Sequence, residues 1–212
     1  MIVSLMWNVD SSLEEGSNKV PRTVFIVLLL LLTLFYRLFA SQIDWLGNTS
    51  PLMAIAFGGG MILGRRFWWL PALLLISSDI SLALFNGWGL GGHLLYTLPF
   101  YVLVSFAGAS LAKKQQWPLM LMGTLSASVL FYLMANTVAW VSSPLYAHNF
   151  AGWLQSQTSG LPGYPPAWSF LRNALLADLI WCLIAAPLFF SRTLMLPAQN
   201  AVNIKREQML FS

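Results

Sequence analysis

The chain has 212 residues, of which 58% are hydrophobic and only 8% are charged. Soluble domains usually carry roughly 25% charged residues, so this composition excludes an ordinary water-facing surface and predicts an integral membrane protein. The net charge is +4, but the basic residues are scattered in pairs, which argues against a nucleic-acid partner. The single cysteine, Cys182, excludes an intramolecular disulfide and gives no metal cluster. No motif identifies a cofactor.

Residues 1–20 are polar and predict a short tail, and the first apolar span covers 23–40. A cleaved signal peptide is the competing interpretation of this span. We favour a retained helix, because the leading residues are acidic and Leu38 stands where a cleavage site would have a small residue.

Five further apolar stretches predict helices in the membrane, with Trp45 as the earliest possible start of the first of them. Their limits are marked by glycine, proline or basic pairs, and they cover 51–63, 67–85, 93–112, 117–141 and 168–190. The uncharged segment 142–167 cannot be one continuous helix, because it contains several prolines and glycines. Its length indicates a lid that covers a pocket rather than a plain connecting loop. His148 and Trp153 are the candidate lid residues.

Basic residues predict the orientation. With six spans and the N-terminus inside, cytoplasmic segments hold nine of the eleven Lys and Arg residues, namely Lys19, Arg22, Arg65, Arg66, Lys113, Lys114, Arg192, Lys205 and Arg206. This is the positive-inside pattern. The sequence therefore predicts an all-α polytopic protein of the bacterial inner membrane with both termini cytoplasmic. Its parts are a tail at 1–20, a six-helix domain at 21–190 and a tail at 191–212.

Four charged residues lie inside the apolar spans and are the main candidates for function: Arg37, Asp79, Arg172 and Asp178. Each costs roughly 2.5–3.5 kcal/mol at a helix centre, so each needs a partner or a hydrated cavity. Helix rise places all four between the midplane and the outer surface. They either form salt bridges that fasten the helices or surround an outward-facing pocket for a solute, and the two interpretations are compatible. Ser78, beside Asp79, adds a hydroxyl to this group.

Small residues recur every fourth position in the second span, at Ala56, Gly60 and Gly64. Such spacing lets helix backbones approach closely, either within the protein or against a partner in the membrane. Enzyme signatures are weak, because His93 and His148 form no HExxH motif and no GxSxG motif is present. An intramembrane enzyme acting on a lipid stays as an alternative.

Two blocks of the sequence resemble an uncharacterised bacterial membrane family. The first is NTSPLMAIAFGG at 48–59, followed by an arginine pair, Pro71 and Ser78-Asp79. The second consists of AGW at 151–153, GLP at 160–162, FLRN at 170–173, and Asp178. The resemblance covers roughly residues 37–190, and residues 163–167 depart from it as an insertion.

That family is similar to the substrate-binding S components of energy-coupling-factor (ECF) transporters. The resemblance implies a six-helix bundle with an outward-facing pocket for a vitamin or metal ion, and a transmembrane coupling subunit with ATPases as partner. Members of this class that work alone, such as cobalamin carriers, leave the partner open. On this basis we expect the following residues to line or brace the pocket: Arg37, Asn48, Ser78, Asp79, Arg172, Asn173 and Asp178. A structural or assembly role in the lipid bilayer, without a small-molecule ligand, is the alternative.

Overall fold

The computed structural model describes residues 22–43, 46, 49–87, 91–114 and 116–186. The chain divides into two units at residue 32, so that residues 33–212 form one unit by themselves. Helix α2 (Arg22–Ala40) runs across this division. Every regular element in the described residues is helical, which confirms the predicted all-α class. The architecture below concerns the unit that begins at Thr33.

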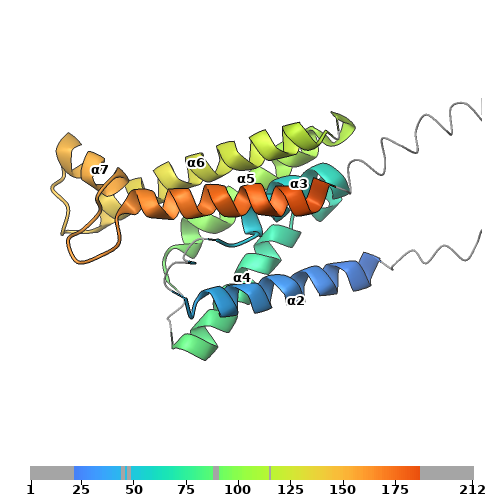
Figure 1. Ribbon diagram of the computed structural model, residues 1–212, viewed down its shortest axis with the longest axis horizontal. Helices are drawn as coiled ribbons and strands as arrows, with labels where there is room; N and C mark the ends of the chain where they lie inside the picture. Colours follow the sequence, from blue (N-terminus) through green and yellow to red (C-terminus); the bar gives the residue numbers. More distant parts are fainter. Residues whose placement is uncertain (1–21, 44–45, 47–48, 88–90, 115, 187–212) are drawn as a thin grey trace, which may run out of the picture. The chain divides into compact units, whose positions relative to one another are not determined.

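Each apolar stretch predicted to form a span is helical in the described part of the chain (Figure 1). After α2 come α3 (Leu52–Leu63), η3 (Arg65–Phe67), α4 (Leu70–Asn86), α5 (Leu94–Ser110), η4 (Ala112–Lys114), α6 (Trp117–Ser142) and α7 (Phe150–Gln157). A further helix, which we call the C-terminal helix, covers Ala167–Ala186.

Three helical stretches are long and apolar enough to cross a membrane: Arg65–Asn86, Trp117–Ser142 and Ala167–Ala186. The first of them takes in both η3 and α4. Three shorter apolar helices accompany them, at Leu31–Ala40, Leu52–Leu63 and Leu94–Ser110. Large apolar side chains such as Leu84, Leu95 and Leu103 point outward and are at least 66% exposed. A surface of this kind suits lipid rather than water. These features indicate a membrane protein.

Helix α3 lies at the centre of the packing, because α4, α5 and α6 all contact it. A Cβ atom at Gly60 would lie 2.2 Å from the carbonyl oxygen of Ser105 on α5. In the same way, a Cβ atom at Gly108 would lie 2.1 Å from the carbonyl oxygen of Phe57 on α3. Glycine at these two positions therefore lets the two backbones touch, which is how small residues act in membrane helix packing.

The C-terminal helix packs beside α6 and α3. Cys182 is fully buried in a cluster with Ala54, Met61 and Met120. The indole nitrogen of Trp117 donates a hydrogen bond of 2.8 Å to the carbonyl oxygen of Cys182. This bond fixes the start of α6 against the end of the C-terminal helix, so the two helices run antiparallel.

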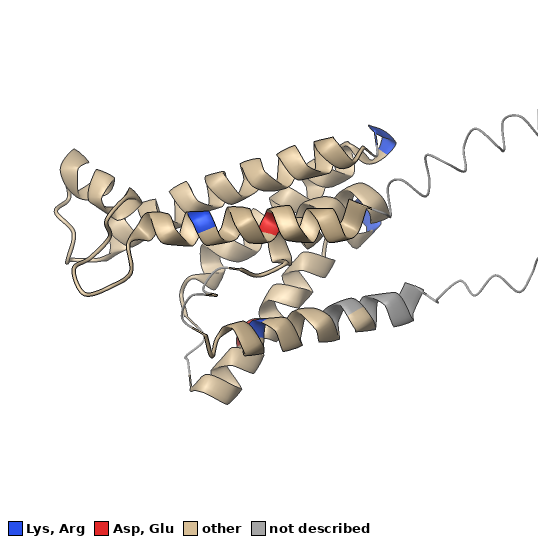
Figure 2. Ribbon diagram, viewed as in Figure 1, with Lys and Arg blue, Asp and Glu red and all other residues tan. Residues whose placement is uncertain are grey.

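The basic residues of η3 and η4 lie at one end of the unit (Figure 2). Arg65, Arg66, Lys113 and Lys114 are all exposed, and η3 and η4 contact α5 and α3. Helix α7 lies at the opposite end (Figure 1). Helix α4 ends at Gly87, whose φ of 68° is left-handed and favours glycine.

Candidate functional site

A cavity of about 350 Å³ lies between the helices of this unit. Six helices contribute to its wall, together with the segment just before α3 and the residue that caps α5. The polar or charged side chains of the wall are those of Arg37, Ser50, Asp79, His93, Tyr96, Thr97, Tyr101, Ser128, Tyr132, Asn136 and Asp178. Its apolar part includes Met53, Phe131, Phe170 and Ala174. Such a wall, in which apolar and aromatic side chains lie between polar groups, is typical of small-molecule sites.

Asp79 joins three elements at one side of the cavity. Its Oδ1 lies 2.9 Å from Nη1 of Arg37 on α2, and its Oδ2 lies 2.9 Å from Nε2 of His93 at the start of α5. The Asp79 side chain is only 7% exposed, whereas that of His93 is 44% exposed. The buried carboxylate is therefore compensated within the protein, as a charge at this depth requires.

Local backbone bonds hold the partners of Asp79 in position. The hydroxyl of Ser78 accepts a hydrogen bond from Arg37 and donates one of 2.9 Å to the carbonyl oxygen of Leu75. Thr97 donates a hydrogen bond of 3.0 Å to the carbonyl oxygen of His93. Ser78 is buried and stands outside the cavity wall. Its role is to position the guanidinium group rather than to face the cavity.

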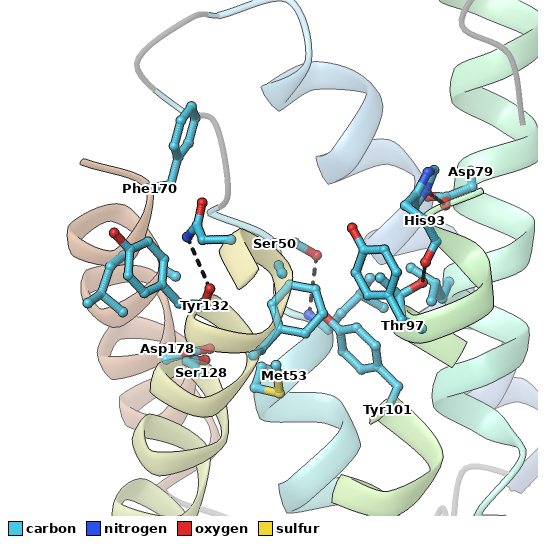
Figure 3. Close-up of a pocket in the computed structure, with 18 of the residues that line it drawn as sticks. Ser50, Met53, Asp79, His93, Thr97, Tyr101, Ser128, Tyr132, Phe170 and Asp178 are labelled. Carbon is cyan, nitrogen blue, oxygen red and sulfur yellow. Dashed lines mark hydrogen bonds and ion pairs between the residues drawn. The ribbon is translucent and has the colours of Figure 1, made fainter. Parts of the chain in front are cut away.

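Asp178 and Ser128 form a second polar group on the opposite side of the cavity, with Tyr101 and Met53 between the two groups (Figure 3). The Ser128 hydroxyl donates a hydrogen bond to Oδ2 of Asp178, which is 2% exposed. Within the described residues, the ion pairs of the chain involve Asp79, and none involves Asp178. A buried carboxylate with a hydroxyl donor thus faces the cavity.

Aromatic rings cover much of the wall between these polar groups. The ring centroids of Tyr101 and Phe131 are 5.8 Å apart, and Phe100 lies 5.3 Å from Phe131 behind them. Tyr132 donates its hydroxyl hydrogen to the carbonyl oxygen of Gln157 on α7. Its ring therefore lines the cavity while its polar end is bonded elsewhere.

A protein-family model matches residues 17–199, which is most of the chain. The chain belongs to the family of unknown function DUF6580. No curated protein and no solved structure matches it. Because the function of the DUF6580 family is unknown, the resemblance to S components stays a prediction.

The structure brings three of the four charges predicted inside the membrane spans of this DUF6580 chain to the cavity and leaves Arg172 outside its wall. Arg172 is exposed, lies 5.3 Å from the ring centroid of Trp168, and donates hydrogen bonds to Oδ1 of Asn173. Six residues separate it from Asp178, and at 3.6 residues per turn this places the two about 120° apart around the helix. Asn173 is likewise absent from the described wall of the cavity. The prediction that all four charges share one chamber is corrected here.

Three other predicted site residues are not among the described residues of the cavity wall. Asn48 lies outside the described residues. His148 packs edge-on against Trp140 with ring centroids 6.0 Å apart, and Trp153 donates a hydrogen bond of 3.1 Å to Thr137 on α6. The segment predicted as a lid contains α7, which packs against the end of α6.

The small residues of α3 divide between two roles. Ala56 and Gly60 are buried inside the protein, where Gly60 meets α5. A Cβ atom at Gly64 would meet nothing within 4 Å, and Gly64 ends α3 with a φ of 75°. Ala56 and Gly60 therefore serve internal packing, and Gly64 serves as the helix cap.

The predicted site omits several polar residues of the cavity wall, among them His93, Tyr101 and Ser128. His93 forms no catalytic motif with His148, which lies far from it in the chain. The available signal for His93 was its place at the start of an apolar helix that follows the helix of Asp79 after a glycine-rich turn. Two helices joined by such a turn are adjacent and antiparallel, so His93 returns toward the level of Asp79.

Proposed function

We propose that this protein is a solute-binding membrane subunit for uptake of a micronutrient, similar to an ECF S component, with six membrane spans and both termini in the cytoplasm. The observation that carries the proposal is the cavity of about 350 Å³ whose wall contains Arg37, Asp79 and Asp178. Charges inside an apolar protein are costly, and they are retained where they mark a ligand or ion site.

The position of the cavity supports binding from outside. The exposed basic residues of η3 and η4 mark the end that the positive-inside rule assigns to the cytoplasm. Residues of α5 that line the cavity, such as Tyr96 and Tyr101, lie in the half of the helix remote from η4. On α6, Tyr132 and Asn136 likewise lie toward α7. A solute would therefore enter from the outer side of the bacterial inner membrane.

A vitamin-sized molecule or a metal ion is the proposed cargo. An S-component-like protein would deliver it with a transmembrane coupling subunit and ATPases, or would act alone in the lipid bilayer. The second candidate function is an intramembrane enzyme. It rests on the bond between His93 and Asp79, since a carboxylate that orients a partly exposed histidine is a common arrangement for a general base.

The test is to fill the cavity and to look for loss of a bound molecule. The purified full chain is extracted from native membranes and its co-purifying small molecules are identified by mass spectrometry. Ala174→Trp places a large ring in the cavity, whereas Leu183→Trp adds the same ring at a position that is 51% exposed on the same helix. We expect the bound molecule to be lost from Ala174→Trp and kept in Leu183→Trp.

A molecule that persists equally in both variants would overturn the binding proposal. His93→Gln separates the two candidate functions, because it keeps a hydrogen-bonding side chain next to Asp79 and removes the basic ring. A binding subunit keeps measurable solute binding in this variant. An enzyme loses turnover of lipid extracts, measured as product formation in reconstituted vesicles.

A further inference from the structure

The two acidic side chains of the cavity differ in what neutralises them. Asp79 bonds both the Arg37 guanidinium and the His93 ring at 2.9 Å. Asp178, on the opposite side of the cavity (Figure 3), accepts a hydrogen bond from Ser128 and forms no ion pair with a described residue. The two basic side chains of the cavity wall, Arg37 and His93, are thus both bonded to Asp79. The Asp178 side is the acidic end of the cavity.

A carboxylate in this position is costly unless something positive meets it. Asp178 is 2% exposed and lies in the middle of the C-terminal helix. Removing an ion from water to an apolar interior costs several kcal/mol, and a nearby opposite charge is the usual compensation. Because its side chain lines the cavity, a ligand in the cavity can supply that charge.

The neighbouring wall indicates which kind of cation fits. Phe131 and Tyr132 follow Ser128 by three and four residues, so they project from the same face of α6. Aromatic faces attract organic cations, and the attraction strengthens where water is excluded. A volume of about 350 Å³ is at the small end of ligand sites.

We infer that the cavity binds a small organic cation, with an amine or quaternary ammonium group beside Asp178 and Ser128 and an apolar or aromatic body against Phe131 and Tyr101. This inference rests on the proposed function and specifies its cargo. Ser128 keeps the carboxylate oriented toward the cavity. The group formed by Arg37, Asp79 and His93 closes the other end and offers hydrogen bonds to the far end of the ligand.

The experiment compares three soluble probes of similar shape and different charge. Benzyltrimethylammonium is the cation, benzyl alcohol the neutral probe and phenylacetate the anion. Their dissociation constants for the purified full chain are measured by isothermal titration calorimetry in a nonionic detergent. We expect the cation to bind at least about tenfold more tightly than either other probe, which corresponds to about 1.4 kcal/mol.

Variants locate the preference within the cavity. Asp178→Asn is expected to reduce the ratio of cation to neutral affinity to near unity, while Ser128→Ala reduces it partially. Arg172→Gln changes a charge on the same helix outside the cavity wall, and it is expected to leave the ratio unchanged. If Asp178→Asn does not fold, the probe series on the unchanged protein decides alone.

The possible failures are distinguishable. Preference for the neutral probe or the anion overturns the inference and leaves the proposed binding function intact. Displacement of the cation by micromolar cobalt or magnesium chloride would also overturn it, in favour of a metal ion as cargo. Absence of binding of all three probes, together with no co-purifying molecule, overturns the proposed function itself.

Discussion

The bond between Arg37 and Asp79 makes a quantitative prediction about stability. The two side chains are 20% and 7% exposed and their atoms meet at 2.9 Å. Removing one partner of a buried ion pair typically costs about 3–5 kcal/mol, because the other charge is left uncompensated. Since Arg37 retains some exposure and His93 still bonds Asp79, we expect Arg37→Met to cost about 2–4 kcal/mol by the same reasoning.

A double-mutant cycle separates the pair from its surroundings. Arg37→Met, Asp79→Asn and the double variant are compared with the unchanged chain. Neighbouring charged residues couple by about 0.5–3 kcal/mol, and we expect a value in the upper half of that range. The double variant should therefore be more stable than the sum of the two single changes predicts.

The single cysteine supplies the assay. Cys182 is fully buried, so a thiol-reactive fluorophore labels it only when the packing around it opens. Heating the protein with such a reagent gives a melting curve, and for chains of this size about 1 kcal/mol shifts the midpoint by roughly 2–4 °C. Arg172→Gln is the matched control and should shift it little, because Arg172 is exposed. Strictly additive shifts in the cycle would refute the argument that the two charges neutralise each other.

Three further predictions use the same melting assay. Gly60→Ala should lower stability by about 1–3 kcal/mol because its Cβ meets the backbone of α5. Gly59→Ala is the control and should not lower it, because its Cβ meets one methyl group at 4.0 Å. Equal shifts of the melting midpoint in the two variants would contradict this packing. Trp117→Phe should cost about 0.5–1.5 kcal/mol by removing the donor to the carbonyl oxygen of Cys182, and an unchanged midpoint would count against that bond. Gly87→Ala should cost about 1 kcal/mol because of the left-handed backbone, and Gly87→Asn should cost less; an equal loss in both would contradict that cause.

The helices could be predicted from the sequence because their ends carry local signals. The predicted span 117–141 corresponds to α6 at Trp117–Ser142, where Pro118 stands in the first turn. The predicted span 67–85 corresponds to α4 at Leu70–Asn86, which Gly87 ends. Glycine and proline act on the backbone directly, so they report helix ends independently of tertiary contacts. The number of helices that cross the membrane, and its sidedness, stay predictions.

The sequence predicts how far along each helix a charged residue of the candidate site lies, but not which side of the helix that residue occupies. Counting residues along each span predicts the level of a charge in the membrane, and Arg37, Asp79 and Asp178 line one cavity. It does not give the side of the helix that faces the interior, which depends on the packing of neighbouring helices. Arg172 shares the helix of Asp178 but faces away from the cavity wall. His93 was missed because its partner lies on another helix.

The segment 142–167 shows a different limit. Its prolines and glycines correctly excluded one continuous helix, but an eight-residue helix forms at Phe150–Gln157. Asn149 caps it by accepting a hydrogen bond of 2.9 Å from the backbone N–H of Gly152, a signal that the sequence carried. Short helices depend on such caps and on tertiary bonds, and here the carbonyl oxygen of Gln157 accepts the hydrogen bond from Tyr132.

The sequence left salt bridging and ligand binding as two interpretations of the same four charges, and the structure shows an ion pair between Arg37 and Asp79. Arg37 and Asp79 satisfy each other, so their presence needs no ligand to explain it. Asp178 lines the cavity and accepts a hydrogen bond from Ser128 on α6, but it forms no ion pair with a described residue. The proposed function therefore depends on Asp178 more than on Asp79. A variant at Asp79 would lower stability and binding together, whereas a variant at Asp178 is expected to change which ligand binds.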